Sequence, residues 1–177
     1  TRKWGAFVPG GGVGGAGMHW TGVLLRPTPT DIKLKTYADQ AYKPGILQEE
    51  MRVMDFPFSW EEIEPWYEKF ERICGLSGQI MEGGDPFEGP RANPMPLPAL
   101  ENTLNCDMFA AATKKMGYHP FTIPSAAASR VWTNPYGNTI TPCNYCGYCS
   151  KYPCLNYSKA SPQTAVLDSL KQMKNFS

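Results

Sequence analysis

Apolar residues recur at helical spacing after Ser59, and this pattern predicts a helix over roughly residues 60–74. Ser59 is suited to cap the first turn, because its hydroxyl can accept a backbone N–H while Glu62, three positions on, completes a capping box. Gly75 then ends the helix. Five apolar residues share one face, which we expect to be buried: Ile63, Trp66, Tyr67, Phe70 and Ile73.

A second helix is predicted over roughly residues 101–116, with Gly117 as its C-terminal stop. Its apolar positions at helical intervals are Leu104, Met108, Ala111, Ala112 and Met116. Residues 118–126 read as a strand or extended stretch. The repeated prolines of residues 83–98 predict an extended connector, and the alternation over residues 31–35 predicts an exposed strand or loop. The fold class expected from this order is mixed α/β.

The composition restricts the kinds of protein this can be. The chain has 177 residues, and 17 Lys and Arg against 16 Asp and Glu give a formal charge of +1. This balance, without a basic run, argues against nucleic-acid binding. Neither a secretory leader nor a run of eighteen apolar residues is visible, so membrane contact is expected only through a partner. The first residue is not Met, and we expect a piece of a larger protein.

The most informative stretch is the glycine-rich segment, GGAGMHWTG, in which one histidine and one tryptophan stand among glycines. Glycine lets a backbone press its N–H groups against a flat or anionic ligand. A flexible loop would explain the glycines alone, but it would not need an imidazole beside an indole. A redox cofactor site can use both. We therefore take all nine residues as candidate cofactor-binding residues: Gly14, Gly15, Ala16, Gly17, Met18, His19, Trp20, Thr21 and Gly22.

A second stretch with reactive side chains, which we call the cysteine loop, has four thiols within residues 143–154: Cys143, Cys146, Cys149 and Cys154. Thiolates this close converge on one soft metal centre, and the first three spacings resemble those of iron–sulfur proteins. Gly147 would permit a sharp turn. A structural zinc site and a pair of disulfides remain alternatives, although zinc modules separate their cysteine pairs further and four neighbouring cysteines strain most pairings. Cys74 and Cys106 are expected to be buried small apolar residues.

The glycine-rich segment resembles the second flavin-binding segment of glucose-methanol-choline (GMC) oxidoreductases, in the branch that contains pyranose oxidase and the membrane-associated gluconate dehydrogenases. The stretch Trp60–Glu71 is similar to a W-x-x-(I/L)-x-P-(W/Y)-Y helix of the family, and the cysteine loop followed by Ser158–Pro162 looks like the gluconate dehydrogenase flavoprotein subgroup. The resemblance implies FAD, carried covalently by His19, with Thr21 near the reactive edge of the flavin.

The resemblance also implies an organisation for the chain. It would be part of a GMC-type FAD-binding domain with part of the adjoining substrate-domain or lid region. Residues 1–58 would supply the FAD-binding segment and a cofactor-covering loop, and residues 59–177 a helical and proline-rich region with the cysteine loop. The N-terminal dinucleotide-binding unit and the C-terminal catalytic segment, with the catalytic base, would lie outside this chain, which would be inactive alone.

The function implied is oxidation of the CH–OH group of a sugar, sugar acid or polyol by hydride transfer to FAD. Electrons would leave through a [3Fe-4S] or [4Fe-4S] cluster to a cytochrome or quinone, with a small subunit and a cytochrome c subunit as partners, on the periplasmic side of a bacterial inner membrane. Two alternatives from other classes remain: an iron–sulfur electron-transfer module that binds no flavin, and a disulfide-stabilised interaction domain.

Overall fold

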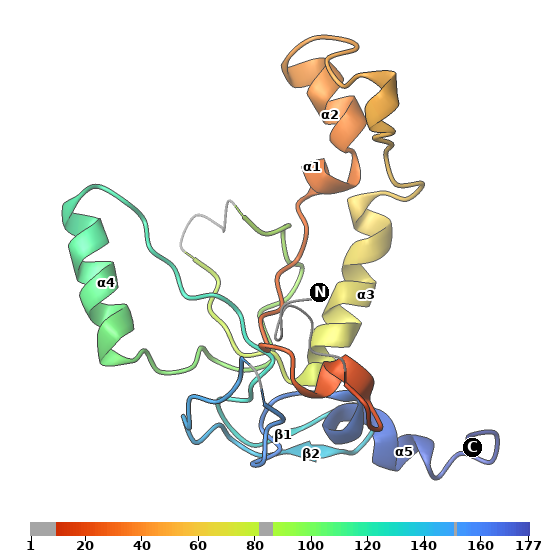
Figure 1. Ribbon diagram of the computed structural model, residues 1–177, viewed down its shortest axis with the longest axis vertical. Helices are drawn as coiled ribbons and strands as arrows, with labels where there is room; N and C mark the ends of the chain where they lie inside the picture. The colour runs from red at the N-terminus through yellow and green to blue at the C-terminus, as the bar shows by residue number, and fades with distance from the viewer. Residues whose placement is uncertain (1–9, 82–86, 151) are drawn as a thin grey trace, which may run out of the picture. The chain divides into compact units, whose positions relative to one another are not determined.

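The computed structural model describes residues 10–81, 87–150 and 152–177. Helices alternate with short extended stretches (Figure 1), and the expected mixed α/β class is confirmed. The elements in chain order are η1 (Gly15–Met18), α1 (Pro29–Ile32), α2 (Leu34–Ala41), η2 (Glu49–Met51), α3 (Trp60–Cys74), α4 (Leu104–Lys115), β1 (Trp132–Thr133), β2 (Thr139–Ile140), η3 (Gln163–Leu167) and α5 (Asp168–Leu170).

The chain forms two compact units. Unit 1 contains Thr1–Leu24, Phe70–Gln79 and Met95–Ser177, and unit 2 contains Leu25–Lys69 and Ile80–Pro94. The functional division at residue 58 is a separate expectation and stays a prediction. Within the described ranges, no helix is both long and apolar enough to cross a lipid bilayer.

Helix α3 begins and ends as the sequence predicts. The Ser59 N–H donates to a Glu62 carboxylate oxygen at 2.7 Å, and the Glu62 N–H donates to the Ser59 hydroxyl at 3.3 Å. Gly75 follows the last turn with φ of +66°, and a Cβ there would lie 2.7 Å from Cδ1 of Trp132. Glycine is therefore required at the end of α3, both for its backbone angle and for the tryptophan ring beside it.

The predicted buried face of α3 is wrong. Trp66 is 62% exposed and Phe70 48%, whereas Glu64 and Glu71 are buried together with Trp60 and Cys74 at the two ends of the helix. The reason in unit 2 is electrostatic: Arg26 Nη1 lies 2.7 Å from Glu64 Oε1, so this carboxylate is buried with a partner of opposite charge. Apolar periodicity alone does not reveal such a pair.

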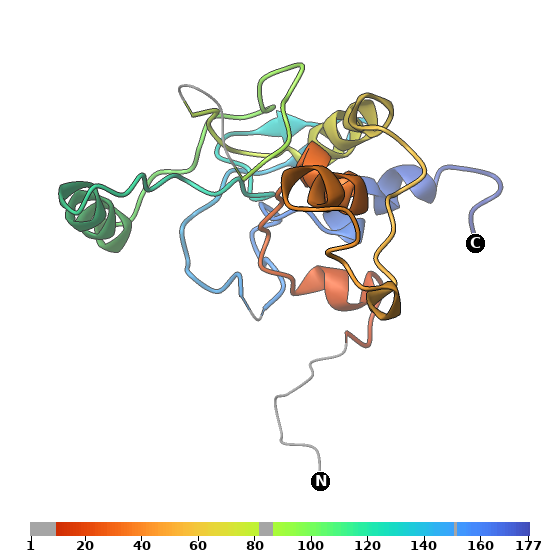
Figure 2. The same cartoon turned by 90° about the horizontal axis from the view of Figure 1, so that it is seen from above.

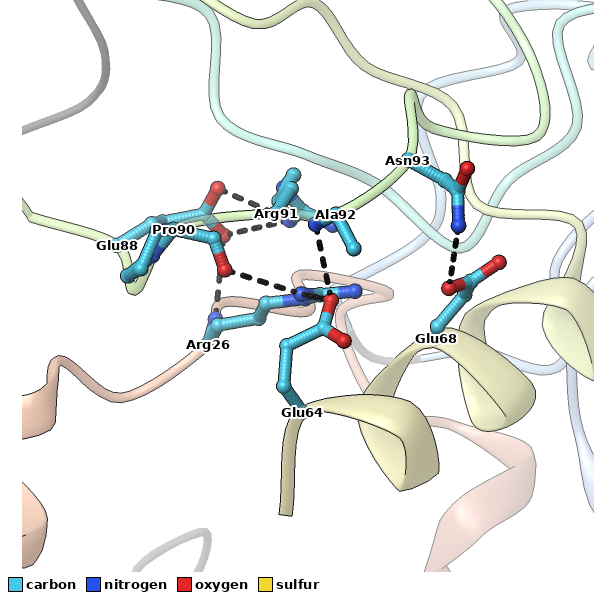
Figure 3. A network of polar contacts seen from close by, with 8 residues as sticks. All are labelled: Arg26, Glu64, Glu68, Glu88, Pro90, Arg91, Ala92 and Asn93. Atoms are coloured by element: carbon cyan, nitrogen blue, oxygen red, sulfur yellow. Dashed lines mark hydrogen bonds and ion pairs between the residues drawn. The ribbon is translucent and has the colours of Figure 1, made fainter. Parts of the chain in front are cut away.

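Glu64 belongs to a network of polar contacts in unit 2 (Figure 3). Its Oε1 also accepts the Ala92 N–H at 3.2 Å, and the Arg26 N–H donates to Glu88 Oε1 at 3.1 Å. Arg91 Nη2 lies 3.0–3.1 Å from both oxygens of Glu88. The network joins three segments: the chain around Arg26, helix α3 and residues 88–92.

The strand or loop expected over residues 31–35 is also wrong, because these residues belong to α1 and α2. Thr28 caps α1: its hydroxyl accepts the Asp31 N–H at 3.3 Å, and an Asp31 carboxylate oxygen accepts the Thr28 N–H at 2.7 Å. Pro29 occupies the first helical position, where its missing N–H is harmless. This capping box was readable in the sequence, and it outweighs the five-residue alternation.

Unit 1 is assembled mainly from paired extended segments around two small cores. One core contains Cys74, Leu76, Ala126 and Ala160, and the other contains Leu97, Ala128 and Ile140. Strands β1 and β2 form an antiparallel pair with Trp132 opposite Ile140 and Thr133 opposite Thr139. Isolated bridges pair Val23 and Ser77 with Ser125, Ser77 with Leu97, and Ala127 with Lys159. These bridges bring together five stretches that are separate in the sequence.

Helix α4 confirms the second predicted helix, and Gly117 follows it with φ of +84°. Extended chain leads into and out of the helix (Figure 2). No residue of α4 is buried, so the expected burial of Cys106 is wrong, whereas Cys74 is buried as expected. Residues 87–98 form an extended connector without helix, as predicted, and residues 83–86 lie outside the described ranges.

Candidate functional site

The glycine-rich segment forms a short, tightly turned structure in unit 1. Gly14, with φ of +95°, precedes the single turn η1, and the His19 N–H closes this turn on the Ala16 carbonyl at 3.2 Å. Gly22, with φ of +86°, ends the segment. The segment is therefore an ordered turn flanked by residues that require glycine.

The glycines of this segment have two different surroundings. A Cβ at Gly17 would lie 3.3 Å from Cδ of Pro162, and one at Gly22 would lie 3.3 Å from Cδ of Lys159. These two glycines accommodate side chains of the chain itself. A Cβ at Gly15 would meet nothing within 4 Å, but the Gly15 N–H already donates to the Gly12 carbonyl at 2.9 Å. Gly15 is half-buried, and its φ of +54° is one that glycine adopts readily.

His19 has a polar atom without a partner. Its Nε2 is buried and has no hydrogen-bond partner among the described residues. Buried polar atoms are nearly always hydrogen-bonded, and the explanations for an exception include strain, a bound water or ion, and a catalytic or redox role. An imidazole nitrogen that lacks a partner within the described residues is chemically suited to a ligand that bonds to it.

Trp20 has a structural role in this geometry. Its indole Nε1 donates to the Ala160 carbonyl at 2.7 Å, and its ring packs against the core of Cys74, Leu76, Ala126 and Ala160. Of the remaining predicted residues, Gly14, Gly15, Gly17 and Met18 are half-buried, Gly22 is buried, and Ala16 and Thr21 are exposed.

Sequence reasoning missed Lys159. Its side chain is 1% exposed, and its Nζ donates to the backbone carbonyl of Trp20, to that of Cys149 at 2.9 Å and to that of Tyr152 at 3.2 Å. One buried amine thus joins the glycine-rich segment to the cysteine loop. In the sequence, Lys159 stands out only because it lies in the Ser158–Pro162 stretch that supports the family resemblance. That resemblance does not indicate that the lysine is buried.

The cysteine loop turns where the sequence predicts, since Gly147 has φ of +80°. All six cysteines lie in the described ranges, and each is a free thiol. The Tyr145 N–H donates to Cys143 Sγ at 3.4 Å, a type of contact that stabilises negative charge on sulfur. Within the described ranges, however, no three His, Cys, Asp or Glu side chains are arranged to hold a metal ion.

The thiols of the loop have different environments. Burial raises the pKa of the Cys149 thiol, with nearby Lys159 acting in the opposite direction and the other three thiols in the same direction. Burial also acts to raise the pKa of Cys154, but N–H donors of Lys159, Ser158 and Asn156 outweigh it, and the net shift is downward. Outside the loop, burial raises the pKa of the Cys74 thiol to about 12, which makes this thiol inert.

Comparison with known proteins shows that the chain is similar to part of three dehydrogenases. No protein-family model matches it. It is 40% identical over 185 residues to the gluconate 2-dehydrogenase flavoprotein of Pantoea cypripedii, an alignment that covers 99% of this chain and 30% of that protein. The resemblance stated from the glycine-rich segment is thereby confirmed: the chain is homologous to part of a GMC-type dehydrogenase flavoprotein.

Two further relatives are more distant. The chain is 30% identical over 119 residues to the fructose dehydrogenase large subunit of Gluconobacter japonicus, covering 67% of the chain and 20% of that protein. It is 29% identical over 118 residues to the 2-methyl-1,2-propanediol dehydrogenase of Mycolicibacterium austroafricanum, covering 67% and 19%. The chain thus spans less than a third of the length of the three relatives.

Proposed function

We propose that this chain is part of an FAD-dependent dehydrogenase that oxidises the CH–OH group of a sugar, a sugar acid or a polyol. The relatives' names support this class, since gluconate, fructose and a propanediol all carry hydroxyl-bearing carbons. FAD supplies the two-electron acceptor for the hydride. The base that takes the hydroxyl proton is proposed to lie in a part of the protein outside this chain.

The observation that carries the proposal is the buried, unpartnered Nε2 of His19. We propose that FAD is attached covalently at this nitrogen, through the 8α-methyl carbon of the flavin. Such an attachment would be a two-electron oxidation overall, in which the imidazole and the methyl group would each lose one proton and the proposed cytochrome or quinone acceptor would take the two electrons. A covalent link prevents loss of the cofactor.

The test compares the only two histidines of the chain in the full-length protein. After denaturing electrophoresis, the wild-type band is expected to show flavin fluorescence, and the band of a His19→Ala variant is expected to be dark. His119→Ala is the matched control, because His119 is exposed and lies outside the glycine-rich segment. Its band is expected to fluoresce like wild type.

A fluorescent His19→Ala band would place the link on another residue. A dark wild-type band, with flavin released by acid, would leave a flavoprotein with a dissociable cofactor. A protein without any flavin would contradict the proposed function.

For the electrons, we propose an iron–sulfur cluster held by Cys143, Cys146, Cys149 and Cys154, with a cytochrome or quinone as the acceptor. The chemistry of the donors supports this, since four free thiols lie in one loop and N–H groups donate to two of them. From the resemblance we also propose two partners, a small subunit and a cytochrome c subunit. The proposed location is the periplasmic side of a bacterial inner membrane. The name of the fructose dehydrogenase large subunit likewise refers to a subunit of a larger assembly.

A further inference from the structure

The side chain of Lys159 is the largest fully buried one among the described residues. Transferring an ammonium group out of water is costly unless hydrogen bonds replace its hydration. An ammonium group has three N–H donors, and three backbone carbonyls accept from Nζ here, those of Trp20, Cys149 and Tyr152. The donors and acceptors therefore match one to one.

The stem of Lys159 also contacts the glycine-rich segment. A Cβ at Gly22 would lie 3.3 Å from Cδ and 3.5 Å from Cγ of Lys159, so the glycine makes room for the methylene groups. The backbone on either side of Lys159 is fixed as well, because the Ala128 N–H donates to Ser158 O at 2.9 Å and the Ala160 N–H to Ala126 O at 2.8 Å. The lysine is held rigidly along its whole length.

The three carbonyls come from two segments that the sequence places far apart. Trp20 is the neighbour of His19, whereas Cys149 and Tyr152 belong to the cysteine loop. The sequence separations from Lys159 are 139 residues for Trp20 and 10 for Cys149. A displacement of the Trp20 carbonyl therefore changes the position of the same ammonium group that holds the cysteine loop.

We propose that Lys159 is a positioning residue that couples the glycine-rich segment to the cysteine loop, so that a flavin bound at the first segment orders the second. The proposal rests on the proposed function for its ligand, and it assigns no contact between Lys159 and the flavin. Binding at the glycine-rich segment restrains the Trp20 carbonyl. Lys159 transmits this restraint to the carbonyls of Cys149 and Tyr152.

The test measures how fast iodoacetamide alkylates Cys149 in the full-length protein, with a chelator present so that a bound metal does not hide the thiol. Flavin-loaded protein is compared with protein from riboflavin-starved cells, and mass spectrometry reads each cysteine. We expect slower alkylation of Cys149 in the loaded protein. Cys106, an exposed thiol on α4, is the internal control, and its rate is expected to stay constant.

The variants assign the coupling to the ammonium group. In Lys159→Met, the ratio of the flavin-free rate to the flavin-loaded rate at Cys149 is expected to fall to nearly one, and in Lys159→Arg it is expected to recover. A ratio taken within one variant cancels the direct effect of the lost charge on the thiol. If Lys159→Met does not fold, Lys159→Gln replaces it, and the comparison in the wild-type protein still decides whether coupling exists.

Equal rates for Cys149 in loaded and flavin-free wild-type protein would overturn the coupling, as would an unchanged ratio in Lys159→Met. Either result leaves the proposed function intact, because flavin would still be bound. A wild-type protein that never binds flavin would instead contradict the proposed function itself.

Discussion

His19 and Trp20 are neighbours in the chain, but the structure gives them different roles. The Trp20 indole donates to Ala160 and packs on a core, whereas the His19 ring has a buried nitrogen without a partner among the described residues. A buried, unsatisfied donor or acceptor costs about 1–3 kcal/mol. A ligand that bonds to this nitrogen removes the free-energy cost. Of the two residues, His19 is therefore the one that we propose to bind the ligand.

At the same scale, the proposed cluster predicts a difference between two exposed thiols. Cys146→Ser, within the cysteine loop, is expected to lower the iron content of the full-length protein. It should also slow electron transfer to a cytochrome more than reduction of the flavin by substrate, because a hydroxyl is a poor ligand for iron. Iron analysis and rapid-mixing spectroscopy measure both effects.

Cys106→Ser on α4 is the matched control for this prediction, because Cys106 is also exposed and lies outside the loop. It should leave iron content and both rates at their wild-type values. Normal iron content and normal cytochrome reduction in Cys146→Ser would remove this thiol from the electron path.

Among the elements, helix α2 depends on a carboxylate from a distant part of the chain. Asp55 Oδ1 accepts the N–H of Lys35 at 2.8 Å and that of Thr36 at 3.2 Å, at the first turn of α2. The Thr36 hydroxyl bond, followed by these N–H groups, lowers the pKa of Asp55. A negative charge here also interacts favourably with the N-terminal end of the helix dipole.

This arrangement predicts that α2 loses stability in acid. Because the folded pKa of Asp55 lies below the ordinary value of about 3.9, its contribution is fully present above about pH 4 and is lost as the pH falls through the folded pKa. Amide hydrogen exchange in residues 34–41 is expected to accelerate, after correction for the intrinsic rate, as the pH falls below about 4. Asp55→Asn should open α2 already at neutral pH and show a weaker acid dependence.

Glu49→Gln is a suitable control for the helix experiment, since it removes a carboxylate of unit 2 that belongs to η2 and lies outside α2. Its exchange profile in residues 34–41 should match the wild type. An Asp55→Asn profile with the same acid dependence as wild type would show that another group controls the opening of α2.

The elements also show what the sequence can and cannot predict. Helices α3 and α4 were predictable because each combines a long apolar period with local end signals, Ser59 and Gly75 for α3 and Gly117 for α4. The short alternation of residues 31–35 was misleading, since the capping box at Thr28 decides the structure there. The glycine-rich segment and the cysteine loop were recognisable from residue types, but their link through Lys159 depends on a contact across 139 positions.

For the molecule as a whole, the arrangement within unit 2 depends on charges that no periodicity reveals. Arg26 and Glu64 lie 38 positions apart, and their side chains are 1% and 12% exposed. Residues 88–92 complete the network through Glu88, Arg91 and the backbone N–H of Ala92. Three segments of unit 2 are thus tied together by polar groups in a place where an apolar core would be expected.

This network predicts that removing one charge destabilises unit 2 strongly. Arg26→Met leaves Glu64 buried without its cation, which typically costs about 3–5 kcal/mol. The double variant Arg26→Met/Glu64→Leu should recover much of this loss, because it also removes the uncompensated carboxylate. Native-state amide hydrogen exchange of residues 60–69 in the full-length protein gives the opening free energy of this segment.

Lys35→Met controls for the loss of any one cation from unit 2. It breaks an exposed ion pair of the same unit, in which Lys35 Nζ lies 3.2 Å from Asp39 Oδ2. Exposed pairs of this kind contribute only about 0.3–0.5 kcal/mol, so its effect should be small. A loss in Arg26→Met no larger than that in Lys35→Met would show that the buried network does not stabilise unit 2. A double variant as unstable as Arg26→Met would show that the loss arises from packing of the arginine side chain, with no part for the carboxylate left behind.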